Sequence, residues 1–127
     1  MDTERSATIK IGCKEYQLIL TTRATKEISK RYGGLENLGE KLMNSESFEM
    51  ALDEVVWLIV LLANQSVLIH NLQNQDKREL LTEETVELLT SPLDLASYKE
   101  AIMEAMMKGT KRYIENEEES SKNIQVG

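Results

Sequence analysis

The sequence has few of the residues that build disulfides, metal sites and nucleic-acid interfaces. It contains one cysteine, Cys13, and one histidine, His70, in 127 residues. A single cysteine excludes an internal disulfide and a cysteine-based zinc site. The formal net charge of −7 argues against a nucleic-acid ligand, because affinity for a phosphate backbone depends on clustered Lys and Arg. The N-terminus has no apolar stretch of the signal-peptide type, so a cytoplasmic protein is expected.

Proline and aromatic residues are also scarce. The chain has one proline, and aromatic residues make up 5% of it. Aliphatic residues and methionine must therefore supply most of the buried core, and the many Leu, Glu and Lys residues favour helices. The length fits one domain. We expect a mainly α fold, a small helical bundle of about five helices with an N-terminal β-hairpin packed on it.

The hairpin is predicted from a period of two. Apolar and polar residues alternate over residues 7–11 and again over 16–20, as in half-buried strands. Gly12 and Cys13 lie between these runs, and glycine at the first central position is typical of a type II′ turn. The register that follows pairs Ile11 with Lys14, Lys10 with Glu15, Ile9 with Tyr16 and Ala7 with Leu18. Two strands alone are barely stable in water, so the apolar face must pack on helices.

Helix signals occupy the rest of the chain. The last helix has the clearest start, because Ser91, Pro92 and Asp94 combine an N-cap, a proline at the first helical position and an acid at the third. The helices are expected from Thr21 or Thr22 to Gly33, from Leu35 to Met43, from near Ser47 to Leu72, from Thr82 to Leu89 and from Ser91 to about Glu115. Residues 1–6 are expected to be a flexible N-terminus, residues 7–115 a single helical domain, and residues 116–127 a mobile acidic tail.

The central helix is apolar almost all round over residues 55–63. A membrane span is one interpretation. However, Asp53 and Glu54 precede this run and Asn64 follows it, which leaves fewer than the roughly 18 to 20 apolar residues that a bilayer requires. We therefore expect a core helix that is covered on most sides, and no membrane partner.

Residues suited to catalysis or metal binding are few. His70 has no second nitrogen or sulfur ligand at a suitable spacing, so a packing or surface role is the simpler interpretation. Cys13 is either a plain turn residue or a reactive thiol. Pairs of acids such as Asp53 and Glu54 are explained by solvated helix faces. We expect no catalytic residue, metal or cofactor, and hence no enzyme.

The last helix carries two further patterns. Small residues recur at every fourth position, which lets another helix approach closely; they are Ser97, Ala101, Ala105 and Gly109. Met103, Met106 and Met107 cover more of the helix than one core stripe needs. Filling of the core is the simpler interpretation, and an adaptable binding surface is the alternative. In that alternative a groove for an apolar segment of another protein is lined by Trp57, Leu61, Leu68, Met103 and Met107.

The order of these features resembles a known family. The residues that carry the resemblance are Ile9 to Ile11, the run Lys14-Glu15-Tyr16-Gln17-Leu18, the run Leu20-Thr21-Thr22-Arg23-Ala24 that enters a helix, and its end at Tyr32-Gly33-Gly34. Together with the helices that follow, up to Tyr113, they resemble the tail assembly chaperones of long-tailed bacteriophages and prophages. One departure is visible: relatives often carry a polar residue and then Gly in the turn, whereas here Gly12 precedes Cys13.

The resemblance implies a non-enzymatic assembly factor of the host bacterial cytoplasm that is absent from the mature virion. Such chaperones bind the phage tape measure protein and help to recruit tail tube protein. In this family a longer form usually arises by frameshifting near the end of the first reading frame. A homo-oligomer is compatible with the sequence. The competing hypothesis is a small phage-encoded regulatory adaptor that binds a host protein.

Overall fold

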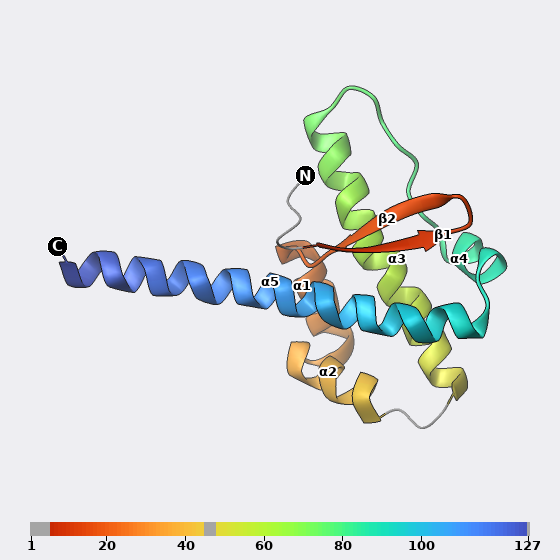
Figure 1. The fold of residues 1–127 in the computed structure, drawn as a ribbon, viewed down its shortest axis with the longest axis horizontal. Coiled ribbons are helices and arrows are strands. Elements are labelled where there is room, and N and C mark those ends of the chain that lie inside the picture. Colours follow the sequence, from red (N-terminus) through yellow and green to blue (C-terminus); the bar gives the residue numbers. More distant parts are fainter. Residues whose placement is uncertain (1–5, 45–47, 127) are drawn as a thin grey trace.

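The computed structural model describes the backbone of residues 6–44 and 48–126 and the side chains of residues 6–42 and 52–110. Its elements are β1 (Ser6–Ile11), β2 (Lys14–Ile19), α1 (Thr22–Tyr32), α2 (Leu35–Asn44), α3 (Phe48–Gln73), α4 (Glu83–Leu89) and α5 (Pro92–Val126). The predicted mainly α bundle with an N-terminal hairpin is confirmed (Figure 1). Of the predicted flexible N-terminus, residues 1–5 lie outside the described residues. Ser6 is buried in β1, so including it in that segment was wrong.

The hairpin has the predicted register. Ile11 pairs with Lys14, and the pairing continues to Ser6 opposite Ile19. Gly12 has a φ of 61°, and no described residue other than glycine has a positive φ. One positive φ, at the first central position, is what a type II′ turn requires. At the open end of the hairpin both faces are covered, because Ser6 and Ile19 are buried as well as Leu18.

Local capping fixes three helix ends, the two ends of α1 and the start of α5, at positions that the sequence predicts. The Thr21 hydroxyl accepts a hydrogen bond from the backbone N–H of Ala24 at 3.0 Å, and Gly33 closes α1 in the left-handed conformation. At the start of α5, the Ser91 N–H donates to the Asp94 carboxylate at 2.9 Å and the Asp94 N–H donates to the Ser91 hydroxyl at 3.2 Å. This reciprocal pair is the predicted capping box.

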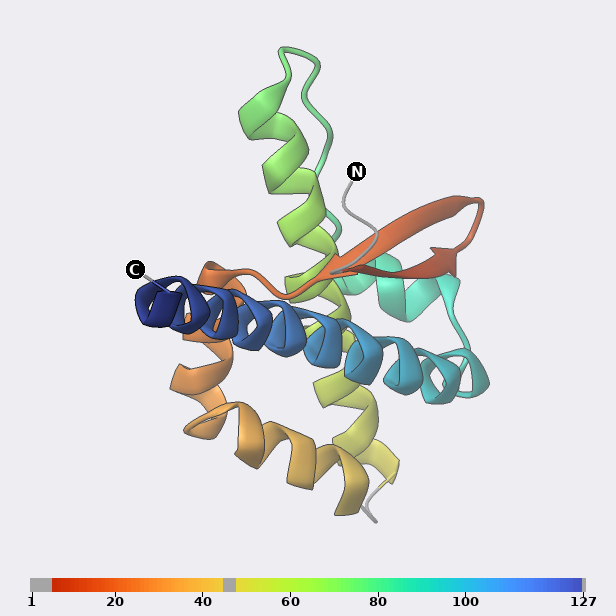
Figure 2. The same ribbon diagram turned by 60° about the vertical axis from the view of Figure 1, so that its left-hand side comes forward.

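Helix α3 forms the centre of the molecule. The hairpin and α5 both cross it, while α1 and α2 lie toward its N-terminal half (Figures 1 and 2). Its most buried side chains lie on one broad face of the helix, while Trp57, Leu61 and Leu68 on the other side are half-buried; the most buried include Val55, Leu58, Ile59, Leu62 and Ala63. Among the described residues, one helical segment, Leu52–Gln73, is long and apolar enough to cross a membrane by length and composition. The expectation that this run is too short was therefore wrong.

Two asparagines on α3 hold the connection that leads to α4. The Asn64 side chain donates to the Leu81 carbonyl at 2.9 Å and accepts from the Leu81 N–H at 2.7 Å. Two turns later, Asn71 makes the same pair of hydrogen bonds with Arg78, at 3.0 and 2.8 Å. Each asparagine side chain thus pairs with both the N–H and the C=O of one residue, as the backbone of a neighbouring strand would. The connection runs back along α3.

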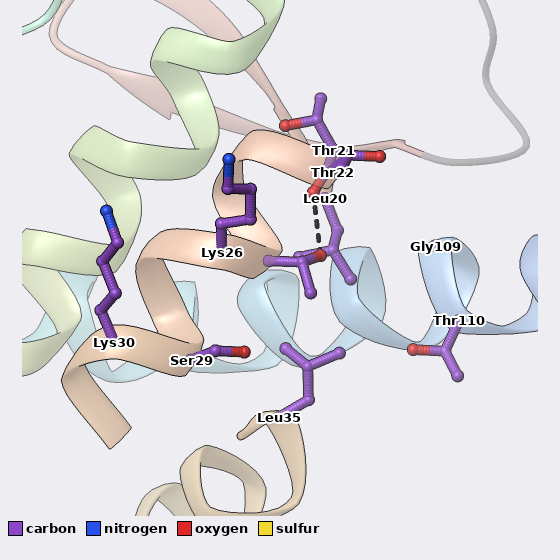
Figure 3. Close-up of a pocket in the computed structure, with 10 residues that line it drawn as sticks. Leu20, Thr21, Thr22, Lys26, Ser29, Lys30, Leu35, Gly109 and Thr110 are labelled. Carbon is purple, nitrogen blue, oxygen red and sulfur yellow. Dashed lines mark hydrogen bonds between the residues drawn. The ribbon is translucent and has the colours of Figure 1, made fainter. Parts of the chain in front are cut away.

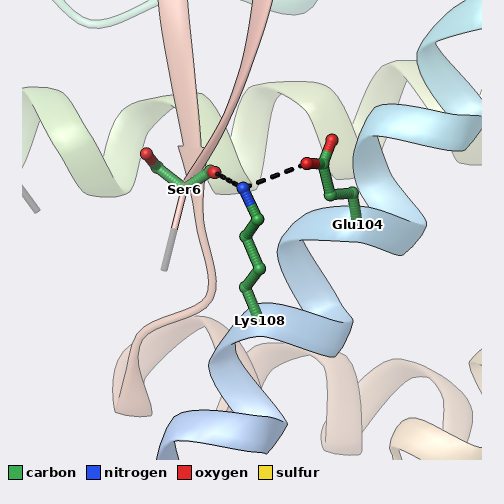
Figure 4. Close-up of polar contacts among 3 residues, drawn as sticks. All are labelled: Ser6, Glu104 and Lys108. Atoms are coloured by element: carbon green, nitrogen blue, oxygen red, sulfur yellow. Dashed lines mark hydrogen bonds and ion pairs between the residues drawn. The ribbon is translucent and has the colours of Figure 1, made fainter. Parts of the chain in front are cut away.

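Helix α5 covers the outer edge of β1. The Tyr98 hydroxyl donates to the Lys10 carbonyl at 2.5 Å. The Lys108 ammonium group donates to the Ser6 carbonyl at 3.0 Å and lies 3.0 Å from the Glu104 carboxylate (Figure 4). These side chains satisfy carbonyl groups that an edge strand would otherwise leave open.

The last helix is longer than predicted. It ends at Val126 rather than near Glu115, and its C-terminal half extends beyond the rest of the molecule (Figure 1). The predicted end was wrong because the acidic composition after Glu115 was interpreted as a loss of helix. Glutamate and lysine are good helix formers, and a helix that has nucleated is extended at little cost.

Candidate partner-binding site

Several large apolar side chains are exposed among the described residues. They are Leu72, Leu80, Leu88, Leu89, Leu93, Met103 and Met107. Single exposed apolar residues are ordinary, but neighbouring ones mark surfaces that bind other molecules. Two groups stand close together in the sequence and the fold: the methionines of α5, and the leucines around the turn from α4 to α5.

The methionine group forms a stripe along α5. Met103 is 36% exposed and Met107 is 71% exposed. Residues three, four and seven apart share one face of a helix, so Thr110 continues the stripe one turn beyond Met107. Met106, in contrast, is half-buried against the core. The structure therefore divides the three methionines between the two interpretations, with one filling the core and two facing outward.

Thr110, at the end of the stripe, lines a cavity between α1 and α5 (Figure 3). The cavity has a volume of about 650 Å³, and its apolar lining comes mainly from leucines, from threonine methyl groups and from a glycine; these are Leu20, Leu35, Thr22, Thr25, Thr110 and Gly109. Gly109 brings the α5 backbone close to the Leu20 side chain. We call this cavity, together with the Met103 and Met107 stripe, the α1–α5 groove.

The cavity face of α1 has a regular spacing. Thr22, Thr25, Lys26, Ser29 and Lys30 lie at positions that share one face of the helix. Most of these side chains are small, so another helix could approach closely. The two charged residues that line the cavity are both lysines, Lys26 and Lys30.

The opposite face of α1 packs on α3, and there it meets the predicted residue Trp57. The Arg31 guanidinium lies 4.4 Å from the centre of the Trp57 ring. The Tyr32 ring packs edge-on against Trp57, with 6.1 Å between the ring centres. Ala24 and Ile28, which are fully buried, belong to this same side of α1. Helix α1 therefore separates Trp57 from the α1–α5 groove.

Leu61 and Leu68 lie on the same stripe of α3 as Trp57. Leu61 is half-buried against the core, and one turn after it the Gln65 side chain accepts a hydrogen bond from the Thr21 hydroxyl. Leu68 is half-buried one turn further on. The structure thus gathers the five predicted residues into two separate stripes, with Met103 and Met107 on α5 and the other three on α3.

The surroundings of Trp57 are polar as well as aromatic. Glu54 is buried, so the prediction of a solvated face was wrong for this residue; its carboxylate lies 2.7 Å from the Lys41 ammonium group. Burial, and next the Glu54 charge, raise the pKa of Tyr32 above its usual value. The Tyr32 hydroxyl is buried and has no hydrogen-bond partner among the described residues. These contacts give the Trp57 region a packing role within the folded chain.

The leucines around the turn from α4 to α5 were not among the predicted site residues. Leu88 is 75% exposed, Leu89 56% and Leu93 82%. Leu89 lies against the hairpin turn, because a Cβ atom placed on Gly12 would be 3.3 Å from its Cδ1 atom. One sequence signal was available. In a helix as short as α4, Val86 takes the buried position, which leaves no covered place for two consecutive leucines.

The few potentially reactive groups do not converge. Within the described residues, no group of three or more His, Cys, Asp or Glu side chains could hold a metal ion. Cys13 is exposed in the hairpin turn. One ring nitrogen of His70 lies 2.8 Å from the Asp76 carbonyl oxygen, in the connection after α3. These groups thus lie in separate parts of the described structure.

The chain was compared with known proteins at three levels. No family model, no curated protein and no solved structure matched it.

Proposed function

We propose that this chain is a tail assembly chaperone of a long-tailed bacteriophage or prophage. It binds apolar helical segments of the tape measure protein and helps to recruit tail tube protein. It acts in the host bacterial cytoplasm and leaves before the virion is complete. Two observations support the proposal. One is the sequence resemblance, and the other is the α1–α5 groove with its exposed methionines.

The groove is the observation on which the proposal depends most. Met107 and Met103 expose apolar surface beside an apolar cavity. Covering such surface with another apolar surface contributes about 25 cal/mol per Å². Methionine side chains are flexible, so one stripe adapts to segments of different sequence. A chaperone for a long chain with many apolar segments needs this tolerance.

The α3 stripe has a second place in the proposal. Trp57, Leu61 and Leu68 are half-buried, and Trp57 and Leu61 pack against the core. Binding of a partner there competes with packing inside the folded chain. We therefore assign the first contact with the partner to Met103 and Met107.

Co-expression tests the proposal. The chain is produced with a tagged fragment of the tape measure protein, and the recovered complex is quantified after affinity purification. Met107→Asp and Met103→Asp are each expected to weaken the complex by about 10-fold, because a carboxylate replaces an apolar anchor. Leu93→Asp is the matched control, since Leu93 is also exposed on α5 but lies near the start of the helix, away from the Met103 and Met107 stripe.

Thermal unfolding of each variant shows whether the free domain still folds. Leu61→Asp is also expected to weaken the complex, but it places a charge in a packed position and lowers stability as well. A complex that is indifferent to both methionine changes would reject the groove. Recovery of one host protein from a host lysate, and never of tail components, would favour the regulatory adaptor instead.

A further inference from the structure

The charged residues that line the cavity of the α1–α5 groove have one sign, opposite to that of the chain as a whole. The formal net charge is −7, yet both charged residues that line the cavity are lysines, Lys26 and Lys30. Lys26 is exposed and takes part in no ion pair within the described residues. The Lys30 ammonium group lies 3.6 Å from the Glu27 carboxylate, and the side chains are 71% and 46% exposed. Such a surface pair is weak, so Lys30 stays available to a partner.

The two lysines are placed to act together. They lie one turn apart on α1 at the edge of the cavity, and their ammonium groups point away from Leu35 (Figure 3). A partner that fills the apolar cavity therefore brings its neighbouring residues next to two positive charges. A basic residue there would be repelled, and an acidic one would be attracted.

The shape of the surface indicates a helical partner. Both walls of the cavity are helices, and the residues on them are mostly small. The stripe from Met103 to Thr110 runs over seven residues, or about 10 Å at 1.5 Å per residue. A compact ligand in the cavity would leave this stripe uncovered. An amphipathic helix laid in a groove covers both, with anchors at intervals of three or four residues.

We propose that the α1–α5 groove selects an apolar helical segment that carries acidic residues one turn from its apolar anchor. The anchor enters the cavity, and the acidic side chains pair with Lys26 and Lys30. This inference rests on the proposed function, because it specifies which segments of a partner the chaperone holds. It adds a chemical criterion that the exposed methionines alone do not supply.

Two designed peptides test the inference. Both are labelled amphipathic helices of Leu, Ala and Gln. One has two Glu residues one turn from the central Leu, and the other has Lys at the same positions. Fluorescence anisotropy gives the dissociation constant of each for the full chain. We expect the Glu peptide to bind about 5-fold more tightly. In the double variant Lys26→Glu/Lys30→Glu the preference should reverse.

The matched control carries the same charge change elsewhere. Lys10 and Lys14 are exposed on the hairpin and do not line the α1–α5 cavity. The double variant Lys10→Glu/Lys14→Glu should therefore keep the preference for the Glu peptide. If this control also reversed it, the preference would come from net charge and the assignment to the groove would be wrong. Equal affinity of the two peptides for the unmodified chain would overturn the inference outright.

Other results separate this inference from the proposed function. If neither peptide binds while a tape measure complex forms and depends on Met107, the charge criterion is wrong and the chaperone proposal stands. If the Glu peptide is preferred but no tape measure fragment binds, the inference that the groove selects an acidic helical segment stands. The assignment of the tape measure protein as the partner then fails. If light scattering shows a dimer that competes with the peptide, the groove is occupied by a second copy and the inference is overturned.

Discussion

At the residue scale, Gly109 shows how close α5 comes to its neighbour. A Cβ atom at this position would lie 2.9 Å from the Leu20 Cβ atom and 3.0 Å from its Cδ2 atom. The sequence predicted that the small residues of this helix allow close approach by another helix. At Gly109 the neighbour is instead Leu20, in the short connection between β2 and α1. Gly39 in α2 is the opposite case, since a Cβ atom there would have nothing within 4 Å.

The two glycines therefore predict opposite effects of the same substitution. Gly109→Ala should lower the free energy of unfolding by about 1–3 kcal/mol, because the added methyl group overpacks against Leu20. Gly39→Ala should raise it by about 0.5–1 kcal/mol, because alanine favours the helix and the site is open. Urea denaturation of both variants measures the difference. A stabilising effect at Gly109 would show that α5 moves away from Leu20 at little cost.

Local sequence signals predicted the residues whose conformation depends on near neighbours. Gly12 was predicted in the turn, Thr21 or Thr22 at the start of α1 and Gly33 at its end; the structure has Gly12 in the turn, Thr21 as the N-cap and Gly33 as the C-cap. Each depends on hydrogen bonds or backbone angles within a few residues. The neighbour of Gly109 is 89 positions away in the chain, since 109 minus 20 is 89, and no periodic pattern indicates it.

At the element scale, the helices and strands were predictable because their apolar periods are regular. The end of α5 was not, because neither proline nor glycine occurs between Gly109 and Gly127 to mark it. The packing of α5 was not predictable either. Its ties to β1 come from Tyr98 and Lys108, which hydrogen-bond to backbone carbonyls of residues far away in the chain.

The tie between Tyr98 and β1 predicts a loss of stability in base. Burial, and next the Asp94 carboxylate, raise the pKa of Tyr98 above the usual value of 10.0. The folded state thus favours the neutral hydroxyl, which donates to the Lys10 carbonyl. This contribution is fully present below the unfolded pKa and is lost as the pH rises through the folded one.

Comparison with Tyr98→Phe isolates this effect, because Tyr32 titrates in the same direction in both proteins. At about pH 8 the variant should be less stable by about 1 kcal/mol, the contribution of one hydrogen bond. Between about pH 9 and 11 it should lose less stability than the unmodified chain. Chemical denaturation at several pH values measures both. Parallel pH profiles would mean that the pKa of Tyr98 is the same in the folded and unfolded states.

At the scale of the whole molecule, only the α5 part of the candidate site could be predicted from the sequence. For the methionines of α5 the sequence favoured filling of the core, with a binding surface as the alternative; Met106 fills the core, whereas Met103 and Met107 are exposed. The other half of the groove comes from Leu20, Leu35 and the cavity face of α1, where threonines and lysines have the pattern of an ordinary solvated face. Only the approach of α5 to α1 turns that face into the wall of a cavity.

The whole-molecule charge and the local lysines also act at different distances, which leads to a kinetic prediction. The Debye length falls from about 30 Å at 0.01 M salt to about 8 Å at 0.15 M. At low salt the net charge of −7 repels an approaching acidic peptide, while Lys26 and Lys30 act at contact. Added salt should therefore raise the association rate of the Glu peptide and also raise its dissociation rate.

Stopped-flow fluorescence at several salt concentrations measures both rates. The Lys peptide is the control, because net attraction to the chain should make its association slower as salt is added. Lys26→Glu/Lys30→Glu should leave the sign of the salt effect on Glu-peptide association unchanged, since that effect belongs to the net charge. The same variant should abolish the rise in the dissociation rate of the Glu peptide with salt, because that rise comes from screening of the two lysines. Dissociation that is independent of salt in the unmodified chain would mean that the bound acidic residues are not paired with Lys26 and Lys30.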